Sequence, residues 1–401
     1  MAATRDSAPP PVVVIGAGPS GLATAAMLRR ARVPAVVIDS GARIGDSWRG
    51  HYDHLRLHTT RALSGLPGLA VPRGCGTWVS RDDWADYLER YATHHRLDIR
   101  THTTAEHLRP APACTADTPY AQAAARWYVR TGSGEHPARA VVLATGRNRV
   151  PYVPDWPGRA TFTGRLLHSR EYRGAESCTG RTVLVVGAGN SGTEIAVAVG
   201  RAGAARVWLS VRTPPNIVPR GSSRWQALGL WAHRLPPAWG DRAAGLMRRL
   251  SLPDLSAHGL PAPAEGLYSR SARDGASPVH DRGIVAAVRA GHVRPVAAVT
   301  GLDGPRVVLA DGTELTPDIV VAATGYRPGL EPLLDPLPVL GARGHPLVSG
   351  ARTSPDAPGL YFAGYTNPLS GALYQAAADA RHIARALRGR FLPLFHPVMR
   401  V

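Results

Sequence analysis

Short runs of uninterrupted apolar residues alternate along the chain with glycine-rich turns and alanine-rich stretches. The runs at 12–15 and 35–38 flank an alanine-rich segment at 21–30, which predicts two buried strands joined by a helix. The same order returns later, where apolar runs at 183–186 and 206–211 flank another alanine-rich segment. Strands that are apolar on both faces and alternate with helices are typical of a parallel sheet covered by helices. The pattern therefore predicts an α/β fold with two such units.

The first strand of each unit ends in the same glycine pattern, Gly-x-Gly-x-x-Gly. In this motif the first glycine makes a tight turn, the second lets the backbone approach a pyrophosphate, and the third lets the helix pack close to the strand. The pyrophosphate then meets the unpaired N–H groups of the helix N-terminus. Two such turns predict that one protein binds two dinucleotides. The expected contacts are Gly16, Gly18, Pro19, Ser20 and Gly21 in the first turn and Gly187, Gly189, Asn190, Ser191 and Gly192 in the second.

The residue that follows the second strand of each unit indicates which nucleotide that unit binds. Asp39 lies about 20 residues after the first glycine turn, where a carboxylate binds ribose hydroxyls. Its alternative role at this place is to cap the next turn. Arg212 stands at the matching place in the second unit, and a guanidinium there suits the 2′-phosphate of NADPH. The second site is therefore expected to bind NADPH rather than NADH.

Two further buried-type strands end in Ala-Thr-Gly, one at 140–146 and one at 318–325. Such strands commonly mark the crossings between a flavin domain and a pyridine-nucleotide domain nested within it. The glycine turn alone does not distinguish NAD from FAD, so the assignment of FAD to the first site depends on the resemblance given below. We expect a disordered lead-in at 1–11, a discontinuous Rossmann-like FAD domain at 12–152 and 318–401, and a nested Rossmann-like NADPH domain at 153–317.

Two other segments are candidates for covering the nucleotide sites. Residues 225–252 combine Trp, Leu and Arg with a Pro-Pro pair and predict two short amphipathic helices, which we interpret as a lid-like or packing element. A membrane-surface helix is the alternative, because Arg on one face and Trp and Leu on the other would suit it. The chain then closes with a strand, a loop and a helix over 359–387. The N-terminus of such a helix faces the flavin in two-nucleotide flavoproteins, which makes Gly364 and Gly371 candidate FAD contacts.

Composition excludes several classes of function. The formal net charge is +18, but all 47 basic residues are arginines spread along the chain, and without a clustered stripe this does not indicate nucleic-acid binding. The absence of lysine excludes Schiff-base chemistry on lysine. Cys75, Cys114 and Cys178 form no C-x-x-C pair, so neither a dithiol redox centre nor a disulfide framework is expected.

Targeting and metal-binding signals are also absent from the sequence. No apolar run is long enough to span a bilayer, and the first eleven residues do not form a signal peptide, so we expect a cytoplasmic protein without membrane association. The histidines at 51, 54 and 58 have no evident carboxylate or cysteine partner, so no metal site is predicted. The expected partner is a small-molecule substrate.

Between the two units, the stretch from Phe162 to Tyr172 matches F-x-G-x-x-x-H-x-x-x-Y. This is the fingerprint of flavin-containing monooxygenases and their N-hydroxylating relatives, and it resembles the Baeyer–Villiger fingerprint except that Trp is typical there at the last position. From about 12 to 386 the chain resembles the YUCCA-type branch, the auxin-forming monooxygenases of plants. The stretches 45–48, 52–58, 218–220, 278–281 and 323–327 carry this resemblance. Asp39, where the family more often has Glu, and the loop 366–370 depart from it.

The resemblance implies FAD in the first site, NADPH in the second and molecular oxygen as co-substrate. It also implies FAD contacts at Trp48, Thr145 and Gly146, and NADPH contacts at His168, Thr324 and Gly325. His58 stands where members that oxidise amines and sulfides usually have Asn, near the oxygen-reacting edge of the flavin. It is therefore the candidate catalytic residue, expected to hydrogen-bond the flavin or its peroxide.

The reaction implied by the resemblance is formation of a flavin C4a-(hydro)peroxide and oxidative decarboxylation of an aryl-2-keto acid. The alternative is N- or S-oxygenation of a small nucleophile, because an unprotonated peroxide attacks a carbonyl whereas a hydroperoxide oxygenates nitrogen or sulfur. Baeyer–Villiger insertion comes third because of Tyr172. An alternative of another class is an NADPH oxidase or an electron-transfer flavoprotein, although no cysteine pair or cluster-ligand spacing marks a partner.

Overall fold

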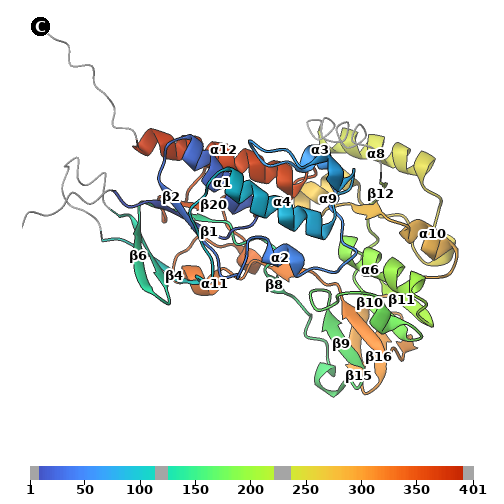
Figure 1. The fold of residues 1–401 in the computed structure, drawn as a ribbon. Coiled ribbons are helices and arrows are strands. Elements are labelled where there is room, and N and C mark those ends of the chain that lie inside the picture. The colour runs from blue at the N-terminus through green and yellow to red at the C-terminus, as the bar shows by residue number, and fades with distance from the viewer. Residues whose placement is uncertain (1–8, 113–124, 221–235, 392–401) are drawn as a thin grey trace, which may run out of the picture.

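The protein has two lobes, each built on a five-stranded parallel sheet (Figure 1). The computed structural model describes residues 9–112, 125–220 and 236–391. The sheet of the first lobe runs in the order β20 (Leu360–Phe362), β7 (Ala140–Leu143), β1 (Val12–Ile15), β2 (Ala35–Ile38) and β3 (Ile99–Arg100). The sheet of the second lobe runs in the order β14 (Arg294–Val296), β11 (Arg206–Ser210), β10 (Thr182–Val186), β18 (Ile319–Ala322) and β9 (Arg165–His168).

Both sheets follow the same plan. The strand that leads into a glycine turn lies in the centre, with the next strand of its unit on one side and the Ala-Thr-Gly strand on the other. These strands are buried along nearly their whole length, which explains their uninterrupted apolar runs. Because all pairings within each sheet are parallel, the carboxyl ends of the strands meet at one edge. The predicted α/β fold with two Rossmann-like units is confirmed.

Three helices cover one face of the first sheet (Figure 1). Helix α1 (Pro19–Arg30) begins two residues earlier than the alanine-rich segment predicts, because proline is well suited to the first helical turn. It packs along α12 (Ala372–Phe391) and also against α4 (Arg81–His94). Apolar residues of β1 point to both faces of the sheet. Val12 and Val14 pack against these helices, and Val13 and Ile15 pack into a second apolar cluster that contains Trp127.

Smaller elements complete both lobes. An antiparallel sheet of β4 (Ala105–Pro110), β5 (Trp127–Thr131) and β6 (Gly134–Ala138) covers the other face of the first sheet together with α11 (Glu331–Leu334). In the second lobe, α6 (Asn190–Arg201) follows β10, and β15 (Val299–Asp303), β16 (Arg306–Leu309) and β17 (Glu314–Leu315) form an antiparallel sheet. Apart from short 3₁₀ turns and the two strands at the crossing between the lobes, the other elements are α2 (Asp46–Arg49), α3 (Arg61–Ser64), β12 (Ile217–Pro219), α8 (Pro237–Ser251), α9 (Leu267–Asp274), β13 (Val279–Asp281) and α10 (Ile284–Arg289).

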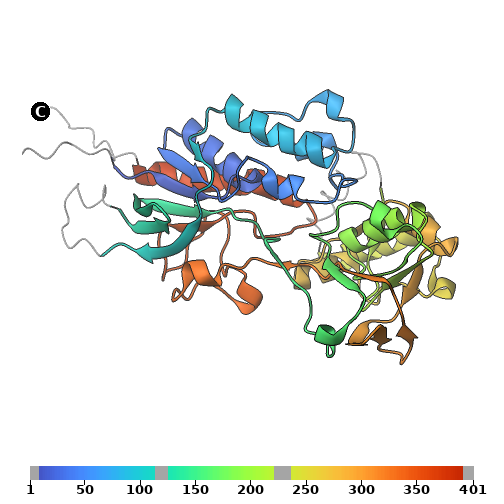
Figure 2. The same cartoon turned by 60° about the horizontal axis from the view of Figure 1, so that its bottom comes forward.

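The chain crosses between the lobes at two neighbouring places (Figure 2). It leaves the first lobe through β8 (Val150–Pro151) and returns through β19 (Tyr326–Arg327), and these two strands pair antiparallel. The backbone N–H of Tyr152 donates to the carbonyl of Gly325 at 3.0 Å, which extends the pairing by one residue.

The segment interpreted as a lid is only partly covered by the structure. Positions 225–235 lie outside the described residues, as do Cys114 and positions 1–8 of the expected lead-in. Over the rest, α8 packs on α9 and exposes Trp239, Leu246 and Leu250 together with Arg242 and Arg249. The exposed residues of α8 include both kinds, and the lid-like or packing element and the membrane-surface alternative both stay predictions. In the described part of the chain, no helix combines the length and apolarity needed to cross a membrane.

Candidate functional site

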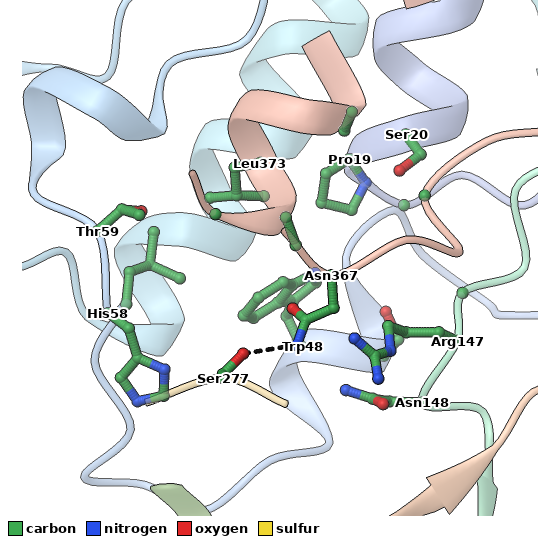
Figure 3. A pocket seen from close by; sticks show the side chains of 18 of the residues that line it. Pro19, Ser20, Trp48, His58, Thr59, Arg147, Asn148, Ser277, Asn367 and Leu373 are labelled. Carbon is green, nitrogen blue, oxygen red and sulfur yellow. Dashed lines mark hydrogen bonds between the residues drawn. The ribbon is translucent and has the colours of Figure 1, made fainter. Parts of the chain in front are cut away.

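A cavity of about 1190 Å³ is lined by residues of both lobes. It is larger than the roughly 300–1,000 Å³ usual for small-ligand pockets, so it has room for more than one small molecule. Figure 3 shows Trp48 near its centre, His58 on one side, and Arg147 and Asn148 on the other, below the N-terminus of α12 at Leu373. Many residues predicted to bind cofactors line this cavity: Gly16, Gly18, Pro19, Ser20, Asp39, Trp48, His58, Thr145, Gly146, Asn190, Ser191, Gly364 and Gly371.

The first glycine turn has the geometry of a phosphate-binding turn. Gly16 has φ +109°, and a Cβ there would lie 2.5 Å from the carbonyl oxygen of Ala144. A Cβ at Gly21 would lie 1.8 Å from the oxygen of Gly16, so helix and strand can approach only with glycine at this position. By contrast, nothing lies within 4 Å of a Cβ at Gly18, the N-cap residue of α1, which makes no side-chain cap hydrogen bond. The open space and the unpaired N–H groups suit a pyrophosphate.

The second turn repeats this geometry closely. Gly187 has φ +110° and would place a Cβ 2.6 Å from the oxygen of Ala323, and a Cβ at Gly192 would lie 1.8 Å from the oxygen of Gly187. Gly189 is the uncapped N-cap of α6, again with nothing within 4 Å. The residues present at both turns therefore fit a dinucleotide.

Asn190 has a different environment from the one the motif suggests. Its side-chain amide donates to the carbonyl of Pro278 at 2.9 Å, and its side-chain oxygen accepts from the backbone N–H of His280 at 2.9 Å. Asn190 therefore connects the second glycine turn to β13, and its role as an NADPH contact stays a prediction.

The residues after the second strands differ in their surroundings. The Asp39 carboxylate accepts hydrogen bonds from the backbone N–H groups of Ala17 at 2.5 Å and Gly41 at 2.7 Å, so it stabilises the first glycine turn and the turn that follows β2. Arg212 is exposed just beyond β11, and none of the described residues pairs with it. Its guanidinium is available to an anionic group.

Loops of the first lobe place the other predicted FAD contacts on the cavity wall. Thr145 shares a hydrogen bond of 2.8 Å with the hydroxyl of Tyr365. A Cβ at Gly364 would lie 2.2 Å from the Ser20 hydroxyl, so the closing strand of the sheet packs directly on the start of α1. Gly371 precedes α12 and lies next to Thr59.

Of the predicted NADPH contacts, only Asn190 and Ser191 line the cavity. His168, Thr324 and Gly325 lie at the crossing between the lobes. The buried side chain of His168 shares a hydrogen bond of 3.0 Å between its Nε2 and the carbonyl of Gly325. The Thr324 hydroxyl donates to the carbonyl of Tyr152. These contacts hold the two crossing segments together, and nucleotide binding by the three residues stays a prediction.

Sequence reasoning missed the group that lies behind His58. Glu194 on α6 is 3 % exposed, and its carboxylate contacts His58 Nε2 at 2.9 Å. It also accepts hydrogen bonds from the Tyr52 hydroxyl at 2.9 Å and from Arg282 at 2.7 Å. An acidic residue among the apolar residues of a buried helix was a usable signal, because a buried carboxylate requires partners.

The charges of this group are set by its surroundings. Burial alone raises the pKa of Glu194, but the hydrogen bond and charge of His58, the charge of Arg282 and the hydrogen bond of Tyr52 outweigh it and lower the pKa. Burial and the neighbouring Glu194 raise the pKa of Tyr52 well above its ordinary value, so its hydroxyl stays a donor. Burial, then the charges of His58 and Arg220, lower the pKa of His280 to about 4.

The cavity is positively charged overall. Among the described residues that line it, the charged side chains are six arginines (Arg43, Arg56, Arg147, Arg149, Arg170 and Arg248) and two aspartates (Asp39 and Asp46). The Arg147 Nε is buried and has no hydrogen-bond partner among the described residues. Burial, followed by the charges of Arg170, Arg173 and Arg81, lowers the pKa of His51 to about 4, so this lining histidine is neutral at pH 7. Such a lining attracts anionic groups.

Comparison with known proteins identifies the family. A family model described as pyridine nucleotide-disulphide oxidoreductase matches residues 13–220, although the described cysteines Cys75 and Cys178 are both free. The chain is 32% identical over 391 residues to the probable indole-3-pyruvate monooxygenase YUCCA7 of Arabidopsis thaliana, covering 93% of this chain and 87% of the relative. It is 33% identical over 387 residues to the indole-3-pyruvate monooxygenase YUCCA1 of Oryza sativa subsp. japonica, covering 95% and 92%.

Solved structures share the fold. A flavin-containing monooxygenase from Stenotrophomonas maltophilia has a TM-score of 0.72 at 24% identity, covering 94% of this chain and 98% of its own. The structure of OTEMO complexed with FAD and NADP has a TM-score of 0.70 at 16% identity, covering 96% and 86%. These structures show the fold, and the expected enzyme class and cofactors are confirmed through the family model and the relatives that are 32% and 33% identical. The chain belongs to the YUCCA-type branch of the flavin-containing monooxygenases and is an FAD- and NADPH-dependent monooxygenase acting on a small molecule.

Proposed function

We propose that this enzyme carries out the oxidative decarboxylation of an aryl-2-keto acid. In the balanced reaction the bond between C1 and C2 of the keto acid breaks, and C1 leaves as CO₂. One atom of O₂ enters the carboxylate that forms at C2, and the other leaves as water. NADPH supplies a hydride and the solvent a proton, which together provide the two electrons and two hydrogens required. The relatives named indole-3-pyruvate monooxygenases support this substrate class.

The observation that carries the proposal is one cavity that both glycine turns reach. Ser20 and Pro19 of the first turn and Asn190 and Ser191 of the second line the same space. A hydride donor and a hydride acceptor bound at the two turns would therefore share this cavity with any substrate it holds. When bound, FAD reduced by NADPH supplies the centre that activates O₂.

The chain's own residues are assigned as follows. The first lobe, which the chain leaves through β8 and re-enters through β19, binds FAD, and the second lobe, whose sheet contains β18, binds NADPH. The uncapped N-termini of α1 and α6 bind the two pyrophosphates. Asp39 binds the FAD ribose while it holds the glycine turn, and Arg212 binds the 2′-phosphate of NADPH. His168, Thr324 and Gly325 act indirectly, by fixing the crossing next to the NADPH site.

The cavity wall suits an aromatic carboxylate. Leu57, Leu63, Leu369, Leu373 and Trp48 supply apolar surface for the aryl ring and help to exclude water from the reacting groups. The excess of arginine over aspartate in the lining favours the anionic cofactors and a negatively charged substrate alike. Because the His58 Nε2 contacts Glu194, Nδ1 is the ring nitrogen through which His58 would accept and return a proton of the reaction.

Isotope tracing tests the proposal directly. The FAD-loaded enzyme is mixed with NADPH, ¹⁸O₂ and indole-3-pyruvate, and the acid product, CO₂ and NADPH oxidation are measured together. We expect one ¹⁸O atom in the shortened acid and one CO₂ per NADPH. Indole-3-lactate is the matched control, because it lacks only the ketone and gives no product.

Other outcomes would identify another reaction. If no keto acid gives a shortened acid while a sulfide or an amine gains one ¹⁸O atom, the enzyme is a heteroatom oxygenase. Hydrogen peroxide released in equal amount to NADPH consumed, and suppressed by no substrate, would identify an oxidase.

A further inference from the structure

The Glu194 carboxylate connects the two lobes behind the cavity wall. Glu194 belongs to α6, the helix that starts at the second glycine turn, whereas Tyr52 and His58 lie between α2 and α3 of the first lobe. Arg282, which follows β13 in the second lobe, completes the group and also donates to the carbonyl of His54 at 3.2 Å. The carboxylate is therefore held from both lobes at once.

The arrangement compensates the burial of a charge. An isolated carboxylate at 3 % exposure would be strongly disfavoured, and the hydrogen-bonding groups around Glu194 offset that penalty. Tyr52 is itself 2 % exposed, with its ring 4.7 Å from the ring of His54 and 6.2 Å from that of Tyr172. The position of Glu194 is consequently fixed on all sides.

This environment dictates which His58 nitrogen carries a proton. An ionised carboxylate has only acceptor capacity, so the contact of 2.9 Å requires hydrogen on His58 Nε2. The His58 ring also stacks on His280, with ring centroids 5.4 Å apart and an angle of 13° between the planes. The backbone of His280 is in turn bound to Asn190, inside the second glycine turn. Two separate contacts therefore run from His58 to the start of α6.

We propose that Glu194 is a positioning residue that keeps His58 in its Nε2–H form at the cavity wall and links it to the helix assigned to NADPH. This inference depends on the proposed role of His58 in the reaction.

The first test observes the proton and needs no substrate. Histidine labelled with ¹⁵N reports the protonated ring nitrogen of His58 through its chemical shifts, and a His58→Gln spectrum assigns the signals. In spectra recorded above the pH at which the ring takes up a second proton, the wild type should show the Nε2–H form alone. In Glu194→Gln the amide can donate as well as accept, so the Nδ1–H form should appear. An Nδ1–H form in the wild type, or an identical spectrum in the variant, would overturn the proposal.

The second test asks whether Glu194 acts through His58. We expect Glu194→Gln to slow NADPH-dependent turnover about tenfold, the low end of what an orienting partner of a histidine contributes. In a His58→Gln background the same change should have almost no further effect, because the residue it positions is already absent. If the two losses instead multiply, Glu194 has a structural role that is independent of His58.

Two further variants keep the tests interpretable. Tyr52→Phe removes one donor to Glu194 without removing a charge, so it replaces Glu194→Gln if that variant fails to fold. In Tyr52→Phe the Nδ1–H form of His58 should also appear, but in a smaller proportion than in Glu194→Gln. Glu135→Gln breaks the ion pair with Arg109 on an exposed strand and should change neither the spectrum nor the turnover. Failure of keto-acid turnover with an unchanged Nε2–H signal would count against the proposed reaction and leave the positioning role intact.

Discussion

The Asp39 carboxylate accepts a hydrogen bond of 2.5 Å from the backbone N–H of Ala17, in the middle of the first glycine turn. This contact joins the end of β2 to the loop between β1 and α1, across 22 residues of sequence. One oxygen of the carboxylate thus supports the turn whose shape admits a pyrophosphate. Binding the ribose and stabilising the turn are therefore compatible roles of Asp39, because one carboxylate can do both.

Asp39→Asn should weaken FAD retention and destabilise the apoprotein. The amide keeps the size of the side chain but loses the charge that strengthens the bonds to Ala17 and Gly41, a loss of about 1–2 kcal/mol in the free energy of unfolding. Urea unfolding without FAD and fluorescence titration with FAD measure the two effects. Asp303→Asn, on an exposed strand end, is the control. An unchanged apoprotein stability together with weaker FAD binding would assign Asp39 to the ribose alone.

Gly189→Val should abolish reduction by NADPH while FAD stays bound. The side chain would fill the open space at the N-terminus of α6, where the pyrophosphate of NADPH is placed. Gly74→Val is a matched control, because a Cβ at Gly74 also meets nothing within 4 Å but lies in the 3₁₀ turn Arg73–Cys75. Anaerobic stopped-flow reduction and the flavin spectrum of the purified variants give the answer. Reduction at the wild-type rate would refute the assignment of the second turn.

Arg212→Gln should remove the preference for NADPH over NADH. An exposed guanidinium paired with a 2′-phosphate contributes one or two charge-assisted hydrogen bonds, so we expect KM for NADPH to rise about tenfold or more. NADH lacks the phosphate, and its KM should change little. Arg206→Gln, at the exposed start of the same strand, controls for loss of one positive charge. Equal effects on both nucleotides would show that Arg212 does not read the phosphate.

Stability should fall as the pH drops from 6.5 towards 4. His51 and His280 have pKa values of about 4 in the folded protein, against 6.5 as the ordinary value. Between these limits the unfolded chain binds protons that the folded chain does not, so acid favours unfolding, by at most about 3 kcal/mol for each histidine.

Urea unfolding over this pH range measures the effect. His280→Asn should make the curve less steep because it removes one of the two histidines whose pKa is lowered to about 4. Val279→Ala, a buried neighbour on β13, should lower the curve equally at every pH. If the pH dependence of the unfolding free energy is as steep in His280→Asn as in the wild type, the lowered pKa of His280 is contradicted.

The sequence was most informative where structure is decided locally. The strands 12–15 and 35–38 and both glycine turns were predictable, because an apolar run and the sterics of Gly16 and Gly21 act within a few residues. Arg212 at the end of β11 also followed from spacing, although the strand itself ends at Ser210, one residue earlier than predicted.

Contacts between distant segments were beyond sequence reasoning. His58 and Glu194 are 136 residues apart, and Glu194 and Arg282 are 88 apart, so no local pattern relates them. The fingerprint histidine His168 was recognisable as a motif, but nothing in the motif indicated that its ring faces the crossing rather than the cavity. Motif membership identifies a residue without giving the direction of its side chain.

The pairing of β8 with β19 has a consequence for how such a chain could arise. Because the second lobe begins and ends at neighbouring points, removing it would leave two chain ends that a short turn could join, and the first sheet would keep all of its strands. The second lobe is therefore one continuous insertion in the first. A single insertion, deletion or exchange of a gene segment could add, remove or replace it without changing the strand order of the first sheet.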